Sequence, residues 1–521
     1  MISRCFSKYS KTLIQSLSIR KYTNEIDEYQ NRINRSLNYQ IEGSLQNQLI
    51  AKKKIKQFEM NNKSLYFKKD ELNEIPDELK YENPFYLSTM NNGVRVCNEE
   101  WDSPIVSIGL AIKAGSRNEC PKTSGSAHFL EHLNFKGTPN RSRIKLETEI
   151  ENMGAHLNAY TSREITLFHI QTTKKNAQKA LDILSDMILN STYSQQDIEN
   201  ERSTILMELE EVNKDFLEVL MENVYFNAFR NHPISLPILG DKDNIKSICR
   251  NDILRFHQEN YIGSNIVVVG AGGIKHKELL DYSENFLKSV KKDLPKEIVK
   301  RGSEKAIFTP AMMLIRDDEL NSSHVGIFYD APSWYHEDYY AFLLMERVFG
   351  TYVNTRQPYF INDMTKQYNR MLSKLAKFPD TSKQQAIFTS MSDSGLFGNY
   401  FHVNEAFTLD FIKLGLSLPK EYCFYLGDEE ISRAKNKIYN ELCNIESSAE
   451  LMQFISHQVI YLNRRVSKTE IAARLSSLSS DQIRRVFRHW ILDSEPSITA
   501  YGPVGKIMEK YSYNDFKKFT Y

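Results

Sequence analysis

The hydrophobic pattern of this chain occurs twice along its length. Residues 103–119 and 323–338 each predict an apolar strand, a turn of small residues and a polar segment that leads into a helix. Each copy also ends in the same way, with a helix followed by an apolar strand. The strand is at 265–270 in the first copy and at 497–502 in the second. We therefore expect a duplicated unit.

The order of elements within each unit is strand, helix, strands, long helices and strand. This order predicts an α+β fold of two similar domains, in each of which helices bury one face of a sheet. A lysine-rich stretch from Lys288 to Lys305 also contains proline and glycine, and we interpret it as the linker. We expect one domain over 85–295 and the other over 305–521.

The composition suits a globular protein and excludes several other classes. Of 521 residues, 41% are hydrophobic and 26% are charged, so the chain is neither disordered nor collagen-like. A net charge of +1 gives no reason to expect nucleic-acid binding by the molecule as a whole. The six cysteines form no CxxC pair, which argues against a disulfide framework and a thiolate zinc site. No stretch approaches the roughly 20 apolar residues of a membrane-spanning helix.

The N-terminal residues 1–22 have the composition of a mitochondrial transit peptide. They carry five basic residues, and no acidic residue precedes Glu25. Their apolar residues are interspersed so that an amphipathic helix can form, whereas a secretory signal has a continuous apolar core. A frayed basic tail is the alternative. Residues 23–84 are rich in Asn, Gln and Lys and form a polar extension of uncertain order, to which we assign no chemistry.

The sharpest chemical signal is the pentapeptide HFLEH, from His128 to His132. On a helix, residues at i, i+3 and i+4 lie on one face, so the two imidazoles can converge on one ion with Glu131 beside them. This HxxEH order is the metal-binding arrangement of the inverzincins. Two ordinary surface histidines near a glutamate are the alternative until a third ligand is found.

A third ligand is expected because a catalytic zinc ion usually has three protein ligands and one open position. Ser194 and Asp197 predict a capped helix start, and the segment ERSTILMELEEV follows on that long helix. Glu201 and Glu208 are seven residues apart, hence on one face. On spacing alone, either could be the ligand.

Acidic residues continue past this point on what the spacing predicts to be the same helical face. They are Glu208, Glu211, Asp215, Glu218 and Glu222, and the segment 197–222 contains nine acidic residues against two basic ones. Like charges at such spacings destabilise a helix. A solvated helix face is the alternative, but a stripe of one sign that begins at a predicted ligand favours a site for a cationic substrate.

Four motifs resemble, in order and spacing, those of the pitrilysin-like inverzincins, and among them the family of mitochondrial processing peptidase β subunits. These motifs are HFLEHLNFKGT from His128, LETEIENMGAHLNAYTSRE from Leu146, ERSTILMELEEV from Glu201 and PILGDKDNIKSI from Pro237. The resemblance covers the chain from Leu87 to Pro503 and includes SDSGLFG from Ser392. Only the N-terminal extension lies outside it.

The resemblance implies a clamshell-like fold and a zinc metalloendopeptidase that removes presequences from imported mitochondrial precursors. It implies that His128, His132 and Glu208 hold one zinc ion and that Glu131 activates a water molecule. Glu201 matches a second glutamate of the family's site, and we predict a catalytic role for it as well. The implied location is the mitochondrion, in the matrix or at the matrix face of the inner membrane.

The resemblance also implies which residues bind the substrate. Glu218 and Glu222 match carboxylates associated with an arginine near the cleavage point, and Phe135 matches a contact of the aromatic residue just after it. Asn158, Ala159 and Tyr160 fall where the family offers a strand edge to an extended peptide. One departure is ISL at 234–236 in place of the usual Leu-Gly-Arg, which removes the family's arginine.

The second half has no counterpart of HxxEH, since the matching helix near 339–350 carries Glu346 without a histidine pair. We expect this half to be non-catalytic and to close a substrate chamber. The resemblance implies an α subunit with a glycine-rich loop as partner, because no such loop is visible here. The alternative function is a core subunit of the respiratory cytochrome bc complex, structural or with a dual processing role, and the intact metal motif argues against a purely structural one.

Overall fold

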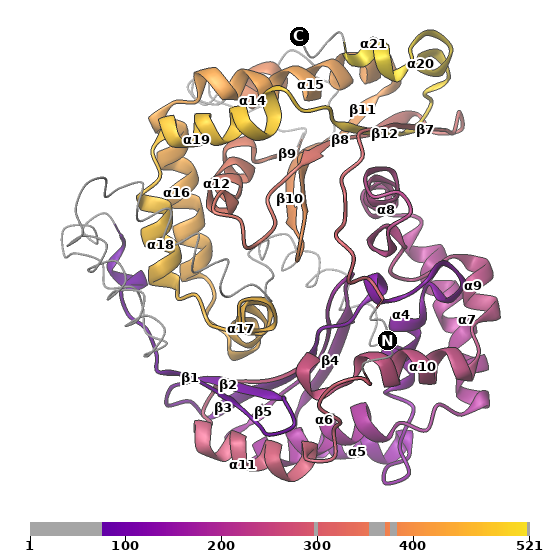
Figure 1. Ribbon diagram of the computed structural model, residues 1–521, viewed down its shortest axis with the longest axis vertical. Coiled ribbons are helices and arrows are strands. Elements are labelled where there is room, and N and C mark those ends of the chain that lie inside the picture. Colours follow the sequence, from indigo (N-terminus) through magenta and orange to yellow (C-terminus); the bar gives the residue numbers. More distant parts are fainter. Residues whose placement is uncertain (1–74, 296–300, 354–369, 376–382, 518–521) are drawn as a thin grey trace.

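The computed structural model describes residues 75–295, 301–353, 370–375 and 383–517, which form two halves of the same design (Figure 1). The predicted transit peptide and residues 23–74 of the predicted extension lie outside the described residues. Among the helices within these ranges, none combines the length and the apolar character needed to cross a membrane.

The first half is built on a six-stranded sheet of order β1-β2-β6-β3-β5-β4. Its strands are β1 (Phe85–Thr89), β2 (Arg95–Glu100), β3 (Ile105–Ile112), β4 (His156–Thr161), β5 (Thr166–Thr173) and β6 (Ile266–Gly272). Its helices are α4 (Ser126–Leu133), α5 (Arg143–Asn152), α6 (Ala177–Asn190), α7 (Gln195–Val212), α8 (Phe216–Ala228), α9 (Lys242–Ser247), α10 (Arg250–Asn260) and α11 (His276–Leu287).

The second half contains another six-stranded sheet, of order β7-β12-β8-β11-β10-β9. Its strands are β7 (Met312–Arg316), β8 (Ser322–Asp330), β9 (Thr351–Val353), β10 (Lys383–Ser390), β11 (Gly395–Asn404) and β12 (Ser497–Gly502). Its helices are α12 (Tyr339–Phe349), α14 (Arg370–Leu375), α15 (Thr408–Tyr425), α16 (Asp428–Cys443), α17 (Ser448–Leu462), α18 (Lys468–Ser476), α19 (Ser480–Phe487), α20 (Gly505–Lys510) and α21 (Tyr513–Lys517).

Five strands of each sheet share one topology, which confirms the duplication predicted from the hydrophobic pattern, whereas β1 and β9 have no counterpart in the other sheet. In the first sheet β6 lies parallel to β2 and antiparallel to β3. In the second, β12 lies parallel to β7 and antiparallel to β8. Helix α12 of the second half therefore corresponds to α4 of the first, because each follows the central antiparallel strand of its sheet.

Each half covers the inner face of the other half's sheet with a helix (Figure 1). Helix α17 of the second half packs on β3 and β6, and a Cβ added at Gly109 of β3 would lie 2.4 Å from Met452 Sδ. Helix α8 of the first half packs on β8 and β12, where the fully buried Asn227 donates from Nδ2 to Ser497 Oγ at 2.9 Å. The halves therefore depend on each other for their cores.

A buried ion-pair network joins the halves near the start of α4. Arg117 lies in the 3-10 helix η3 (Ser116–Asn118), and its guanidinium contacts Glu164 of the first half at 2.9 Å and Asp393 of the second at 2.5 Å. It also donates to the carbonyl oxygens of Gly302 and Glu304, at 2.9 Å each, in the segment that connects the halves. A guanidinium with partners on all sides is well suited to burial.

Residues 75–84, which the sequence assigned to the polar extension, pack against the second half. Ile75 and Leu79 are buried in its core, with exposed fractions of 3% and 1%. Thr469 donates a hydrogen bond to the carbonyl oxygen of Leu79. Arg465 contacts Glu82 at 3.1 Å. The end of the extension is thus part of the fold, because two apolar side chains within a polar segment are enough to anchor it.

We predict that Arg117→Met lowers the free energy of unfolding by about 3 to 5 kcal/mol, because it leaves Glu164 and Asp393 without their buried cation. Urea-induced unfolding of both proteins measures the difference. Arg143→Met is the matched control, since Arg143 and Glu147 form a largely exposed pair that contributes about 1 kcal/mol or less. Equal stability of the two variants would contradict the structural importance of the network.

Candidate metal centre

The helix that carries HFLEH, α4, begins at a glycine that no other residue could replace easily. Gly125 has φ of 98°, and a Cβ added there would lie 2.7 Å from the carbonyl oxygen of Leu239. The carboxylate of Glu119 accepts from the backbone N–H groups of Gly125 at 2.8 Å and Ala127 at 2.6 Å. These bonds satisfy two donors at the start of the helix. Burial raises the pKa of Glu119 well above its usual range, although the two bonds act in the opposite direction.

Three side chains converge beside this helix, two from α4 and one from α7. Nε2 of His128 lies 3.7 Å from Glu208 Oε1, and Nε2 of His132 lies 3.3 Å from Glu208 Oε2. Ligand atoms of the three residues all lie within 4.8 Å of one another, and within the described parts of the chain this is the group that could hold a metal ion. The helical face predicted from i and i+4 spacing is confirmed.

The structure separates the two glutamates between which the spacing could not choose. Glu208 faces both histidines, whereas Glu201 lies behind His132 and contacts its other ring nitrogen, Nδ1, at 3.0 Å. Glu201 is 6% exposed and also contacts Lys136 Nζ at 2.6 Å. The predicted cap of α7 is present as well, because Ser194 Oγ accepts from the backbone N–H of Asp197 at 3.1 Å.

The two histidines differ in their proton affinity. Burial, together with the nearby His132, lowers the pKa of His128 to about 4, so its imidazole is neutral at neutral pH. Burial also opposes the charged form of His132, but hydrogen bonds with Glu201 and Glu208 outweigh it and raise its pKa to about 9. Without a metal ion, a proton on His132 compensates part of the negative charge of the two carboxylates.

Glu131 lies on α4 between the histidines in sequence and is half-buried. Burial raises its pKa to about 7, although His132 and a hydrogen bond from Thr161 act in the opposite direction. Thr161 Oγ1 donates to Glu131 Oε2 at 2.6 Å. A carboxyl group with a pKa near neutrality can both accept and return a proton, which is the property that general acid–base catalysis requires.

This donor set fits a catalytic zinc ion. Two imidazoles and one carboxylate are a common set of three protein ligands, and the side chain of Glu208 is 41% exposed, so the centre opens to solvent. The second nitrogen of a zinc-binding histidine usually contacts a carboxylate or a carbonyl group, as His132 does with Glu201. Nδ1 of His128 is buried, and no hydrogen bond among the described residues uses it.

The predicted peptide-binding strand lies at a sheet edge close to the metal centre. Strand β4, which contains Asn158, Ala159 and Tyr160, is last in the order of its sheet, and its end packs beside α4. Tyr160 is engaged across the halves, because its hydroxyl contacts His457 Nε2 of α17 at 2.7 Å. Phe135 follows α4 and packs against the buried Phe168, with ring centroids 6.2 Å apart.

The prediction of one continuous acidic helix face is wrong. Helix α7 ends at Val212 and α8 begins at Phe216, because Asp215 caps the new helix by accepting from the backbone N–H of Leu217 at 3.1 Å. An aspartate is a strong helix-start residue, and its position between the helices is the sign that spacing alone overlooked. Glu208 and Glu211 thus lie on a different helix from the remaining acidic residues.

The two acidic residues predicted to bind arginine lie on α8. Glu218 is half-buried in the first turn of this helix. Glu222 Oε2 is 2.5 Å from Arg163 Nη2, and the same guanidinium lies 3.6 Å from the ring centroid of Tyr225. An arginine of the protein itself therefore occupies one side of Glu222.

Sequence reasoning missed three residues that shape this centre: Glu119, Lys136 and Thr161. Each lies within or just before a motif that was recognised. Lys136 is four residues after His132, but α4 ends at Leu133, and Glu119 and Thr161 lie on other elements. Their contacts depend on how η3, the end of α4 and the end of β4 meet in space. No local pattern in the sequence distinguishes them from ordinary polar residues.

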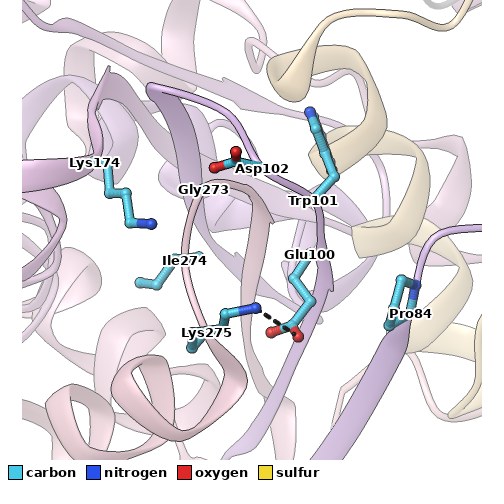
Figure 2. Close-up of a pocket in the computed structure, with 8 residues that line it drawn as sticks. All are labelled: Pro84, Glu100, Trp101, Asp102, Lys174, Gly273, Ile274 and Lys275. Carbon is cyan, nitrogen blue, oxygen red and sulfur yellow. Dashed lines mark hydrogen bonds and ion pairs between the residues drawn. The ribbon is translucent and has the colours of Figure 1, made fainter.

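A pocket of about 250 Å³ lies where β2, β5 and β6 end (Figure 2). It is lined by Pro84, Glu100, Trp101, Asp102, Lys174, Gly273, Ile274 and Lys275. Figure 2 shows Lys275 directed toward Glu100, to which it is paired at 3.3 Å. None of the residues of the metal centre lines it, and we assign it no part in the chemistry.

Comparison with known proteins identifies the family. The family described as insulinase (peptidase family M16) matches residues 95–242, and the peptidase M16 inactive domain matches residues 247–438. The first match contains the metal centre and the second includes α12, which lacks the histidines. Solved structures share the fold: complex III of Candida albicans has a TM-score of 0.72 at 20% identity, covering 84% of this chain and 99% of that one. A protease from Helicobacter pylori has a TM-score of 0.70 at 21% identity, covering 80% and 99%.

Curated relatives extend over most of the sequence. The mitochondrial-processing peptidase subunit beta of Mus musculus is 34% identical over 430 residues, which cover 81% of this chain and 85% of that protein. The subunit of the same name from Lentinula edodes is 33% identical over 423 residues, covering 80% and 90%. The motifs, the duplicated fold and these matches agree, and the chain belongs to peptidase family M16, together with the β subunits of mitochondrial processing peptidases.

Proposed function

We propose that this chain is the catalytic β subunit of a mitochondrial processing peptidase, a zinc metalloendopeptidase that removes N-terminal presequences from imported precursors. The observation that carries the proposal is the convergence of His128, His132 and Glu208 with Glu131 beside them. A structural subunit that had lost catalysis would have no need of a half-buried acid next to an intact ligand set.

In this proposal, some residues of the site bind the metal ion and one residue transfers a proton. His128, His132 and Glu208 would be the ligands, and Glu201 would keep His132 oriented through Nδ1. A zinc ion held by these residues would supply Lewis acidity toward the scissile carbonyl group and would lower the pKa of water. Glu131 accepts the proton of the attacking water and then returns it to the departing amine. In this assignment Glu201 acts through His132, so we propose that it is a positioning residue.

We predict that Glu131→Gln retains zinc and lowers kcat by at least about 100-fold, because the amide cannot accept the proton. Glu208→Gln should lose zinc affinity first, since it removes a ligand. Metal analysis and cleavage of one presequence peptide, with the α subunit present, separate the two effects. Glu210→Gln is the matched control on the same helix, where the side chain is 70% exposed and should change neither property. Cleavage by Glu131→Gln at nearly the wild-type rate would refute the assignment.

We predict that zinc binding at pH 8 releases about one proton, which comes from His132. Because its pKa is about 9, the imidazole of His132 is mostly charged at pH 8. Only the neutral imidazole binds zinc, so the affinity for zinc rises as the pH increases toward 9. His128 is already neutral. Calorimetric titration in buffers of different ionisation enthalpy measures the release. Glu201→Gln should reduce it, because the hydrogen bond that raises the pKa of His132 is lost, and a binding enthalpy independent of the buffer would contradict the prediction.

The substrate proposal rests on the strand edge and on the acids of α8. An extended presequence can add to the free edge of β4 through main-chain hydrogen bonds, with its scissile bond carried toward Glu131. Glu218 and Glu222 are placed on the helix that follows the ligand Glu208, and a carboxylate pairs with the fork of an arginine side chain. Arg163 pairs with Glu222 at 2.5 Å, so an arginine of the substrate would meet Glu222 beside an arginine of the protein itself.

We predict that Glu218→Gln reduces the preference for arginine over citrulline at the recognised position by roughly tenfold, the scale of one charge-assisted hydrogen bond. Citrulline is nearly isosteric with arginine and uncharged, so the ratio of kcat/KM for two otherwise identical peptides isolates the charge. Glu211→Gln is the control for a general loss of negative charge, because its side chain is 75% exposed. An unchanged ratio in Glu218→Gln would place the arginine site elsewhere.

We propose a mitochondrial location, in the matrix or at the matrix face of the inner membrane, and an α subunit with a glycine-rich loop as the partner. The support is the identity to subunits named beta and the transit-peptide composition of residues 1–22. The alternative, a core subunit of the cytochrome bc complex, stays a prediction. The similarity to the complex III chain is at 20% identity and concerns the fold.

A further inference from the structure

We propose that Thr161 is a positioning residue that orients Glu131 for proton transfer and couples it to the strand on which the peptide docks. This inference rests on the function proposed above. It begins from the hydrogen bond of 2.6 Å that Thr161 Oγ1 donates to Glu131 Oε2. No other hydrogen bond among the described residues involves the Glu131 carboxylate, so its rotation depends on this one hydroxyl group.

The position of Thr161 in the hairpin fixes the direction in which its hydroxyl group donates. Thr161 is the last residue of β4, where it pairs with Thr166 of β5. A tight turn follows, in which Ser162 donates from its backbone N–H to the carbonyl oxygen of Ile165 at 2.7 Å. The hydroxyl group therefore projects from a backbone that is held on both strands of the hairpin, and a donor held in this way fixes the carboxylate that it contacts.

Further contacts hold the same turn from outside the hairpin. The backbone N–H of Arg117 donates to the carbonyl oxygen of Arg163 at 2.8 Å, and a Cβ added at Gly115 would lie 2.1 Å from Ser162 O. From the second half, Ser392 donates to Glu164, with its backbone N–H 3.2 Å from Oε2. Thr161 is thus placed by contacts from both halves.

The chemistry of the hydrogen bond suits a proton acceptor. Because Thr161 occupies Oε2, the other carboxylate oxygen, Oε1, is left for a water molecule. A carboxylate aligned before the reaction loses no rotational freedom in the transition state, so the benefit appears in kcat rather than in peptide binding. A peptide added to the edge of β4 would also run past Thr161. The same residue would therefore contact the docked peptide's strand and orient Glu131.

The test compares Thr161→Val, Thr161→Ser and Thr166→Val in the full chain with its α subunit. Valine keeps the shape and removes the hydroxyl group, whereas serine keeps it. We expect Thr161→Val to lower kcat by about tenfold or more, with KM and zinc content within about twofold of wild type, and Thr161→Ser to recover most of kcat. Thr166→Val is the matched control, because its hydroxyl group donates to the Ala114 carbonyl at 3.0 Å and not to Glu131.

Four outcomes would overturn the inference. The first is a wild-type kcat in Thr161→Val, and the second is a loss of activity in Thr161→Ser as large as in Thr161→Val. The third is an equal loss in Thr166→Val, because this loss would indicate damage to the hairpin. A loss of zinc in Thr161→Val that matches the loss of activity is the fourth, since it would make the residue part of metal binding. A wild-type enzyme without zinc-dependent cleavage would instead refute the proposed function and this inference with it, so the two failures are distinguishable.

Discussion

The constraint on which the rest of this structure depends is that neither sheet can bury its inner face alone. Helices of its own half cover one face of each sheet, and the other face receives a helix from the opposite half, α17 on the first sheet and α8 on the second. Gly109 allows α17 to approach closely, and the buried amide of Asn227 ties α8 to β12. Because apolar burial is the main favourable term in folding, this exchange keeps the halves closed on each other.

The contacts that hold the two halves together are linked to the metal centre through one short segment, residues 117–119. Arg117 joins the halves by its contacts with Glu164 and Asp393, and two residues later Glu119 caps the helix that carries His128 and His132. The turn that holds Thr161 receives contacts from Arg117 and from Ser392 of the second half. The second half therefore contributes contacts to the turn beside the metal centre, although none of its described residues belongs to the group of His128, His132 and Glu208.

The arrangement of the site was predicted better than its surroundings. The i, i+3 and i+4 spacing of HFLEH predicted that His128, Glu131 and His132 share one helix, because a helix converts sequence distance into direction, and the structure brings the two histidines together with Glu208. The same reasoning failed for the acidic stripe, where Asp215 starts a new helix and the two helices change direction between Val212 and Phe216. Periodicity holds only while the helix continues, and a capping residue inside a periodic run is the sign that it ends.

The sequence by itself determined the duplicated α+β architecture, the placement of the two histidines on α4 and the capped start of α7, since each follows from local periodicity and local hydrogen bonds. Spacing left Glu208 and Glu201 as alternatives, and the family resemblance implied Glu208. Only the tertiary structure showed that Glu201 contacts the other nitrogen of His132, paired Arg163 with Glu222, and placed Thr161 against Glu131. Three of these contacts are hydrogen bonds, and the two residues that each one joins are between 30 and 69 positions apart in the sequence. Their geometry depends on how strands and helices pack, for which a single sequence carries no local signal.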